Sequence, residues 1–195
     1  MILFQETYRD RLAIAVADLP AWRAWLVEHH GREQSIWLII FRKADDRSSL
    51  TYAEAVDEGL CFGWIDSLPN KRDGRSYYQL FSPRNPKSNW SRVNKQKVAR
   101  LLAQGRMAAP GLEMVRLAKR SGTWDALNDV EELVVPDDLR QALAGEPTAW
   151  KHWEDYPPST KRGILEWLFN AKRATTRAQR IERTLAAARR GARPF

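Results

Sequence analysis

The apolar run Ile36–Phe41, six consecutive large apolar side chains, constrains the fold more than any other stretch of the sequence. It is far shorter than the about 18 apolar residues that a membrane-spanning helix requires, and no other run approaches that length. A short run of this kind predicts a strand that is buried on both faces, with neighbours on either side. We therefore expect it at the centre of a sheet.

Further strands are predicted on both sides of this run in the sequence. Residues 64–68 and 76–82 have strand character, and the turn dipeptide Asp73-Gly74 lies between them, so we expect a hairpin with a long loop. Residues 1–8 alternate weakly, as in an edge strand. Together these segments predict a small, mostly antiparallel sheet.

Two helices are expected in the same part of the chain. Pro20 suits the first turn of a helix that carries Trp22 and Trp25 on one face. Thr51 and Glu54 have the spacing of a capping box, which predicts a second helix from there to about residue 60.

Beyond Pro86 the pattern is helical. Ser88 or Ser91 is expected to cap a helix that continues to about residue 103, and Ser159 and Thr176 are expected to cap two later helices. The acidic residues 126–145 are interpreted as a linker followed by a short helix. The fold class predicted is α+β, mainly helical, with a sheet-containing domain at residues 1–125 and an all-helical module at 126–195.

Bulk properties favour a cytoplasmic globular protein. The 195 residues are 44% hydrophobic, which is enough for a packed core. The first residues lack the basic start and long apolar stretch of a signal peptide. Cys61 is the only cysteine, so no internal disulfide and no cysteine-based metal cluster can form. No cofactor is implied.

The net charge of +8 is distributed in blocks. Residues 1–83 carry −2, residues 84–120 carry +9, residues 121–145 carry −5 and residues 146–195 carry +6. Basic blocks favour anionic partners such as nucleotides or nucleic acid, although solvated helix faces give the same signal.

The segment from Ser82 to Ser91 is the strongest candidate for an anion site. Prolines 83 and 86 stiffen it, and it brings a guanidinium, an ammonium and serine hydroxyls to the start of a helix. Arg84 suits a bidentate grip on phosphate or carboxylate, whereas Lys87 acts as a point charge. The alternative is structural: the serines only cap the helix and the tryptophan only fills the core.

Asp66 is the second candidate. Strand alternation places it on the same face as Trp64, where partial burial requires a partner, and Arg84 or Lys87 is expected to supply one. An ion pair that anchors the hairpin and a ligand-binding or acid–base role both remain open. The full predicted ligand set is Trp64, Asp66, Arg84, Lys87, Ser88, Trp90 and Asn94.

Arginines near the end of the chain form a third candidate surface. Arg173, Arg177 and Arg180 have i, i+4, i+7 spacing. They suit either phosphate contacts or pairing with the acidic residues 121–145. A nucleic-acid interface is therefore the alternative hypothesis, with contacts from Lys95, Lys97, Arg100, Arg177 and Arg180.

Catalytic signatures are missing from the sequence. It contains no GxSxG elbow, Gly-rich phosphate loop, HExxH or paired-cysteine spacing. Cys61 is interpreted as a small buried hydrophobe rather than a nucleophile. No catalytic residue is therefore assigned and a non-enzymatic role is favoured, with Asp66 the one candidate for a general acid or base.

An ordered set of motifs resembles the bacterial YdeI/OmpD-associated family, also described as bacteriocin-protection proteins. The sequence blocks that carry the resemblance are LCFGWIDS at 60–67, PRNPKSNWS at 83–91, VPDDL at 135–139 and AK with TRAQRI at 171–181. The resemblance implies a role in stress or bacteriocin protection, assigns no catalytic residue, and identifies the end of the chain with the family's carboxyl-terminal module.

The leading hypothesis is that the chain binds a small anionic or phosphorylated ligand without catalysing a reaction. Nucleic-acid binding through the basic helices is the alternative. A third hypothesis is a surface that binds a protein partner under stress, and the sequence does not identify that partner.

Overall fold

The computed structural model describes residues 1–42, 47 and 49–195 of the chain. Contacts between Cα atoms divide it into two compact units, Met1–Trp124 and Asp125–Phe195. Within the described residues, no helix is both long enough and apolar enough to cross a bilayer.

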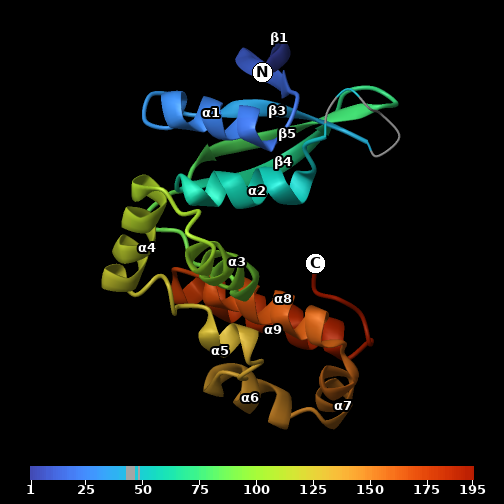
Figure 1. The fold of residues 1–195 in the computed structure, drawn as a ribbon. Helices are drawn as coiled ribbons and strands as arrows, with labels where there is room; N and C mark the ends of the chain where they lie inside the picture. The colour runs from blue at the N-terminus through green and yellow to red at the C-terminus, as the bar shows by residue number, and fades with distance from the viewer. Residues whose placement is uncertain (43–46, 48) are drawn as a thin grey trace. The chain divides into compact units, whose positions relative to one another are not determined.

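Figure 1 shows the elements of the amino-terminal unit. They follow one another as β1 (Ile2–Tyr8), β2 (Arg11–Val16), α1 (Leu19–His29), β3 (Ile36–Phe41), α2 (Tyr52–Cys61), β4 (Trp64–Lys71), β5 (Ser76–Pro83), α3 (Arg92–Ala103) and α4 (Ala109–Ser121).

The strands form one sheet in the order β1-β2-β3-β5-β4. As expected, β3 is central and all of its residues are buried. The β4–β5 hairpin is confirmed, and Asp66 lies opposite Phe81 in its register. The sheet is mixed because β2 and β3 run parallel. The α+β class is confirmed, with helices packed on one face of this sheet.

Strand β2 was not predicted from the sequence. It follows β1 through a two-residue turn in which Arg9 and Asp10 have φ values of 51° and 57°. Two consecutive positive φ angles are typical of a type I′ hairpin turn, which usually contains Asn-Gly or Asp-Gly. Arg-Asp gives no such signal, so the hairpin cannot be recognised from its turn.

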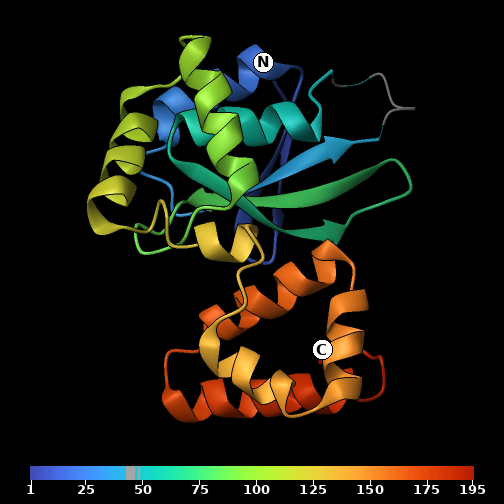
Figure 2. The ribbon, with the colours of Figure 1, turned by 90° about the horizontal axis from the view of Figure 1, so that it is seen from below.

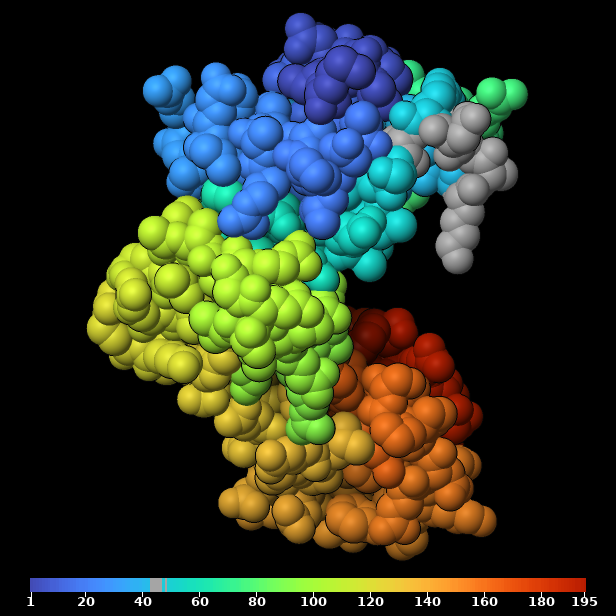
Figure 3. Space-filling view, viewed as in Figure 1, coloured from blue at the N-terminus to red at the C-terminus, as the bar shows by residue number. Residues whose placement is uncertain are grey.

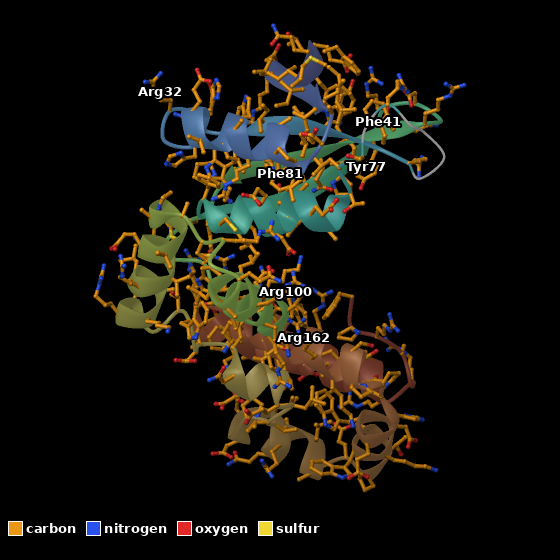
Figure 4. The ribbon with its side chains drawn as sticks, viewed as in Figure 1. Arg32, Phe41, Tyr77, Phe81, Arg100 and Arg162 are labelled. Atoms are coloured by element: carbon orange, nitrogen blue, oxygen red, sulfur yellow. The ribbon has the colours of Figure 1, made fainter. Side chains whose placement is uncertain are left out.

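Helices α1 and α2 cover one face of the sheet (Figures 1 and 2). The main core lies between these layers and contains Trp22, Trp25, Leu60 and Phe81. Figure 4 shows the Phe81 side chain between β5 and α2. Its ring lies 3.3 Å from the position that a Cβ would occupy at Gly59, so this glycine lets α2 approach the sheet closely.

The opposite face is covered by side chains of β1. Tyr8 stacks on Tyr78 of β5 with ring centres 3.9 Å apart. Arg72 donates hydrogen bonds of 2.9 and 3.0 Å to the two carboxylate oxygens of Glu6. Since β1 and β5 are separated by two strands in the sheet order, the stacking of Tyr8 on Tyr78 shows that the end of β1 reaches over this face of the sheet.

Helices α3 and α4 complete the unit, and both contribute to the surface seen in Figure 3. Ser91, one of the two predicted caps, accepts a hydrogen bond of 3.3 Å from the N–H of Asn94 and caps α3. Helix α4 lies very close to the end of α2. At Gly111 a Cβ would lie only 2.2 Å from the carbonyl oxygen of Cys61, so only glycine allows this approach.

The carboxyl-terminal unit is helical in its described elements. These are α5 (Asn128–Glu131), α6 (Asp137–Ala144), α7 (Pro147–Asp155), α8 (Pro158–Phe169) and α9 (Ala174–Ala188). Its core contains Leu139, Leu143, Trp153 and Leu168.

Two predicted caps in this unit are wrong. Helix α8 begins after Pro157, so Ser159 lies inside its first turn. Helix α9 begins at Ala174, two residues before Thr176, and its N-cap residue is Arg173. Neither helix has a side-chain cap. Ser159 lies two residues after the N-cap position of α8, and Thr176 lies three residues after that of α9, so both hydroxyls come too late in the sequence to cap their helices.

Candidate functional site

The loop between β5 and α3 is ordered by its own hydrogen bonds. Asn85 accepts bonds from the N–H of Lys87 at 2.9 Å and from the N–H and hydroxyl of Ser88 at 2.9 and 2.7 Å. The N–H of Trp90 donates to the carbonyl of Thr123 at 3.2 Å, which fastens the end of the loop to the end of α4. The loop therefore has a defined shape, as its two prolines predict.

Arg84 lies beneath this loop and is only 5% exposed. Its guanidinium carbon is 3.9 Å from the ring centre of Trp90, and it donates a hydrogen bond to the carbonyl of Asn89. Its Nε has no hydrogen-bond partner among the described residues. Burial lowers the pKa of this guanidinium to about 10, and no carboxylate in the described part of the chain offsets the loss of solvation.

Two tryptophans of the predicted ligand set belong to the core. Trp64 is 1% exposed and donates a 3.1 Å hydrogen bond from its indole to the carbonyl of His30. Trp90 is 2% exposed and packs against Trp124, with ring centres 5.0 Å apart. The sequence left open whether these rings are core or wall. In this structure both rings are buried and offer no open face to a ligand, and Trp90 packs beneath the loop beside Arg84.

Asp66 does not have the partner expected from the sequence. It accepts a 2.5 Å hydrogen bond from the hydroxyl of Tyr52, at the start of α2. Burial, and next the bond to Asp66, raise the pKa of this tyrosine. The side chain of Arg84 turns instead toward Trp90. The predicted pairing of Asp66 with Arg84 is therefore wrong. The prediction considered only the β4–β5 hairpin, and the sequence did not show that the start of α2 places Tyr52 beside Asp66.

The remaining predicted residues lie along the loop and the first turn of α3. Lys87 is exposed at the tip of the loop, and Ser88 and Asn94 are half-buried. The structure therefore keeps Arg84, Lys87 and Ser88 in one short segment. It places Trp64 in the core and Asp66 in a separate pair with Tyr52.

The cations of the alternative nucleic-acid set are largely engaged. Lys97 lies 3.4 Å from Asp57, and Arg100, labelled in Figure 4, forms an ion pair with the same carboxylate. Arg177 donates two hydrogen bonds to Asp138, at 2.5 and 2.9 Å. The sequence left two roles open for Arg177, phosphate contact or pairing with the acidic residues 121–145. The ion pair with Asp138 confirms the second role.

The two other cations of that set lie against tryptophan rings. Lys95 is 6.0 Å from the ring centre of Trp124. Arg180 is 5.0 Å from that of Trp167 and donates to its backbone carbonyl. The carboxylates beside Lys97, Arg100 and Arg177 reduce what these three cations can offer to phosphates.

Sequence reasoning missed two buried acids on α2. Glu58 is 1% exposed and binds both Arg23 and Arg106, the latter at 2.7 Å. Asp57 is 9% exposed. The hydrogen bond to Glu58 raises the pKa of Arg106. The sequence did contain a signal for this burial. Asp57 and Glu58 directly follow Val56, which was expected to face inward, so at least one of the two acids must lie near the core.

Within the described residues, no group of three or more His, Cys, Asp or Glu side chains is placed to hold a metal ion. Cys61 is buried, and burial raises the pKa of its thiol to about 11. This thiol is therefore protonated near neutral pH and a poor nucleophile.

Taken together, these features define a two-unit α+β protein whose amino-terminal unit holds a buried arginine beneath a basic loop, with no carboxylate beside it among the described residues. The chain belongs to the family described as Domain of unknown function (DUF8412), whose model matches residues 14–114, more than half of the sequence. Residues 132–191 match a second family, described as Bacteriocin-protection, YdeI or OmpD-Associated. Searches of curated proteins and of solved structures found no match.

The family resemblance seen in the sequence is thereby confirmed, on the carboxyl-terminal module. The LCFGWIDS block at 60–67 and the PRNPKSNWS block at 83–91 lie within residues 14–114, the region matched by the DUF8412 model. The candidate anion loop therefore belongs to the part of the chain matched by the first family.

Proposed function

We propose that the amino-terminal unit binds a small anionic ligand, most simply a phosphorylated one, at the loop from Arg84 to Ser91. The observation that carries this proposal is the burial of Arg84 with no carboxylate partner among the residues that the structure describes. Isolated buried charges are unfavourable, and they are usually paired or coordinate a ligand. An anion at this position would neutralise Arg84 and accept a bond from its unpartnered Nε.

The surrounding sequence supports the same chemistry. From residue 84 to residue 112 the chain contains seven Lys and Arg residues and no Asp or Glu. The amino end of α3, a helix of twelve residues, adds free backbone N–H groups and the positive end of the helix dipole. Lys87 supplies an exposed positive charge at the loop tip, while the hydroxyl of Ser88 is engaged with the carbonyl of Asn85.

The nucleic-acid alternative has less support, because Lys97, Arg100 and Arg177 already bind carboxylates. An enzymatic role for Asp66 also has less support, since the carboxylate is held by Tyr52. The cytoplasm remains the proposed compartment.

The proposal is tested by thermal denaturation of the full chain with inorganic phosphate, sugar phosphates, nucleotides and short RNA and DNA, at low and moderate salt. We expect one class of small phosphate to raise the melting temperature. Arg84→Met and Lys87→Gln should reduce this shift. Arg32→Gln is the matched control, because it removes an exposed charge beyond the end of α1 (Figure 4).

A shift that is equally large in Arg84→Met and in the unmodified chain would refute the assignment. Stabilisation by long nucleic acids alone, erased by moderate salt, would favour the basic helices instead, because such binding depends on counterion release.

A further inference from the structure

The carboxyl-terminal unit contains a mostly apolar cavity of about 150 Å³. Its walls come from α5, α8, α9 and the segment between α5 and α6. The apolar lining includes Val130, Val134, Leu165 and Phe169, and the polar lining residues are Asp129 and Arg177. All of these residues belong to one unit, so the cavity is formed within that unit.

The cavity has a buried floor and an exposed apolar rim. Val130 and Leu165 are buried, whereas Val134 and Phe169 are 47% and 43% exposed. Scattered apolar side chains are normal on a protein surface, but exposed apolar side chains that surround a common hollow indicate an interaction site. The rim therefore suits contact with an apolar group from outside the unit.

Hydrogen bonds fix the shape of the cavity. The N–H of Val134 donates to the carbonyl of Asp129 at 2.8 Å, which closes the turn after α5. The nitrogens of Arg177 donate to both carboxylate oxygens of Asp138 and, at 3.1 Å, to the carbonyl of Leu168. Arg177 thus already has a carboxylate partner and forms part of the wall, so the cavity does not favour an anion.

The volume of the cavity limits what can enter it. Pockets that hold a whole small molecule usually have about 300–1,000 Å³. An apolar cavity of about 150 Å³ instead holds a group of the size of a benzene ring. It therefore suits one large apolar side chain of a partner protein better than a free ligand, because single side chains that fill such pockets commonly anchor interfaces.

The charge around the cavity is negative. Residues 125–139 contain six Asp and Glu and no Lys or Arg, and this segment forms the α5 side of the cavity. Asp129 is itself a lining residue, so its carboxylate lies within one side-chain length of the cavity. Among the described residues, neither Asp129 nor Glu132 takes part in an ion pair. Such a surface attracts a basic partner and repels an acidic one.

We propose that this cavity is the docking site for a basic segment of a partner protein. One large apolar side chain of that segment fills the cavity against Val134 and Phe169, and a neighbouring Lys or Arg lies beside the carboxylate of Asp129. The cavity volume selects a single side chain, and charge complementarity selects a basic segment. This docking site is independent of the anion site proposed at Arg84, which lies in the other unit of the chain.

The test is a ¹⁵N NMR titration of the full chain with three end-capped pentapeptides at low salt. The first peptide has one phenylalanine between two pairs of lysines, the second has alanine in place of the phenylalanine, and the third has glutamates in place of the lysines. We expect the amide resonances of Val130, Val134 and Phe169 to shift and saturate with the first peptide. The second should bind at least about tenfold more weakly, because burial of the ring is lost. The third should give no saturable shift.

Two variants separate the apolar contact from the charge. Phe169→Ser should weaken binding of the phenylalanine peptide while the response to the alanine peptide stays unchanged. Asp129→Asn should weaken binding of the phenylalanine peptide about two- to fivefold at low salt and less at high salt, because salt screens exposed charges. Asp155→Asn is the control, since it removes an exposed carboxylate outside the cavity lining. Arg84→Met should bind the peptide as the unmodified chain does.

Equal affinity for the phenylalanine and alanine peptides, or unchanged affinity in Phe169→Ser, would overturn the proposal, because charge alone would then explain the binding. Saturable binding of the glutamate peptide would overturn it as well. Dilution of the chain without peptide is the last measurement. If the same amide resonances shift with protein concentration, a second copy of the chain occupies the cavity, and a separate basic partner is not its occupant.

Discussion

The guanidinium of Arg84 lies 3.9 Å over the ring of Trp90, and that ring is itself fixed between the loop and Trp124. Arg84 is therefore held in one orientation in the free protein. Preorganisation of this kind lowers the entropy lost on binding, but here it leaves a buried charge that no carboxylate of the described residues offsets. A site arranged in this way should sacrifice stability for function.

Replacement of Arg84 by methionine tests this trade-off. Methionine keeps a long unbranched side chain beside Trp90 and removes the charge, so the free energy of unfolding should stay the same or rise by up to about 2 kcal/mol. The measurement is urea denaturation of both proteins without ligand. A loss of more than about 2 kcal/mol would show that Arg84 is mainly a structural contact.

Arg106→Met is the matched variant for comparison with Arg84→Met, because it makes the same substitution at an arginine that does have a carboxylate partner. Arg106 is 2.7 Å from Glu58, whose side chain is 1% exposed. Removing it leaves a buried carboxylate with Arg23 as its remaining ion-pair partner, so stability should fall by about 3 kcal/mol. The opposite responses of two arginines would reflect the presence or absence of a carboxylate beside each.

Local sequence signals predicted the elements that depend on local chemistry. The capping box at Thr51 identified the start of α2, and the apolar run identified β3. The hairpin between β1 and β2 was missed, because Arg9 and Asp10 form its turn without glycine or asparagine. The parallel pairing of β2 with β3 depends on where α1 packs, which no single segment encodes.

Gly111 should be the least replaceable glycine of the amino-terminal unit. A Cβ there would lie 2.2 Å from the carbonyl oxygen of Cys61, which is backbone and cannot move aside easily. Gly111→Ala should lower the free energy of unfolding by about 2–3 kcal/mol, as expected for overpacking. Gly74→Ala is the control, because nothing lies within 4 Å of its Cβ position. Equal stability of the two variants would mean that α4 can shift away from α2 at little cost.

Acid should weaken the contact between α6 and α9. The hydrogen bonds from Arg177 are the main cause that lowers the pKa of Asp138. Because the folded-state pKa lies below the unfolded value of about 3.9, the pair stabilises the unit above that pH and loses its effect as pH falls through the folded-state pKa. Both side chains are partly exposed, so the contribution should be about 1 kcal/mol or less.

Hydrogen exchange of α9 amides between pH 7 and pH 2, extrapolated to a common intrinsic rate, measures this effect. Asp138→Asn should destabilise α9 at neutral pH and make no difference at the acid end. Asp137→Asn is the neighbouring control, because the Asp137 side chain is 92% exposed. A difference between Asp138→Asn and the unmodified chain that persists at pH 2 would contradict the ion-pair explanation.

The candidate site was predictable in its chemistry but not in its geometry. Charge and proline spacing pointed to the loop around Arg84 and Lys87. Strand alternation correctly predicts that Trp64 and Asp66 point to the same face of β4. It does not predict how deeply each position along the strand is buried by the helices that cover that face. Trp64 is consequently core, while Asp66 meets Tyr52 from a helix fourteen residues earlier.

The most direct test of the central claim is the ¹⁵N NMR signal of the Arg84 Nε–H during titration with inorganic phosphate at constant ionic strength. No described residue accepts a hydrogen bond from this group, so a bound anion should move its resonance along a saturable curve that Lys87→Gln weakens. A resonance that stays in place far above about 1 mM phosphate, where a site worth about 4 kcal/mol would be filled, would contradict anion binding by Arg84.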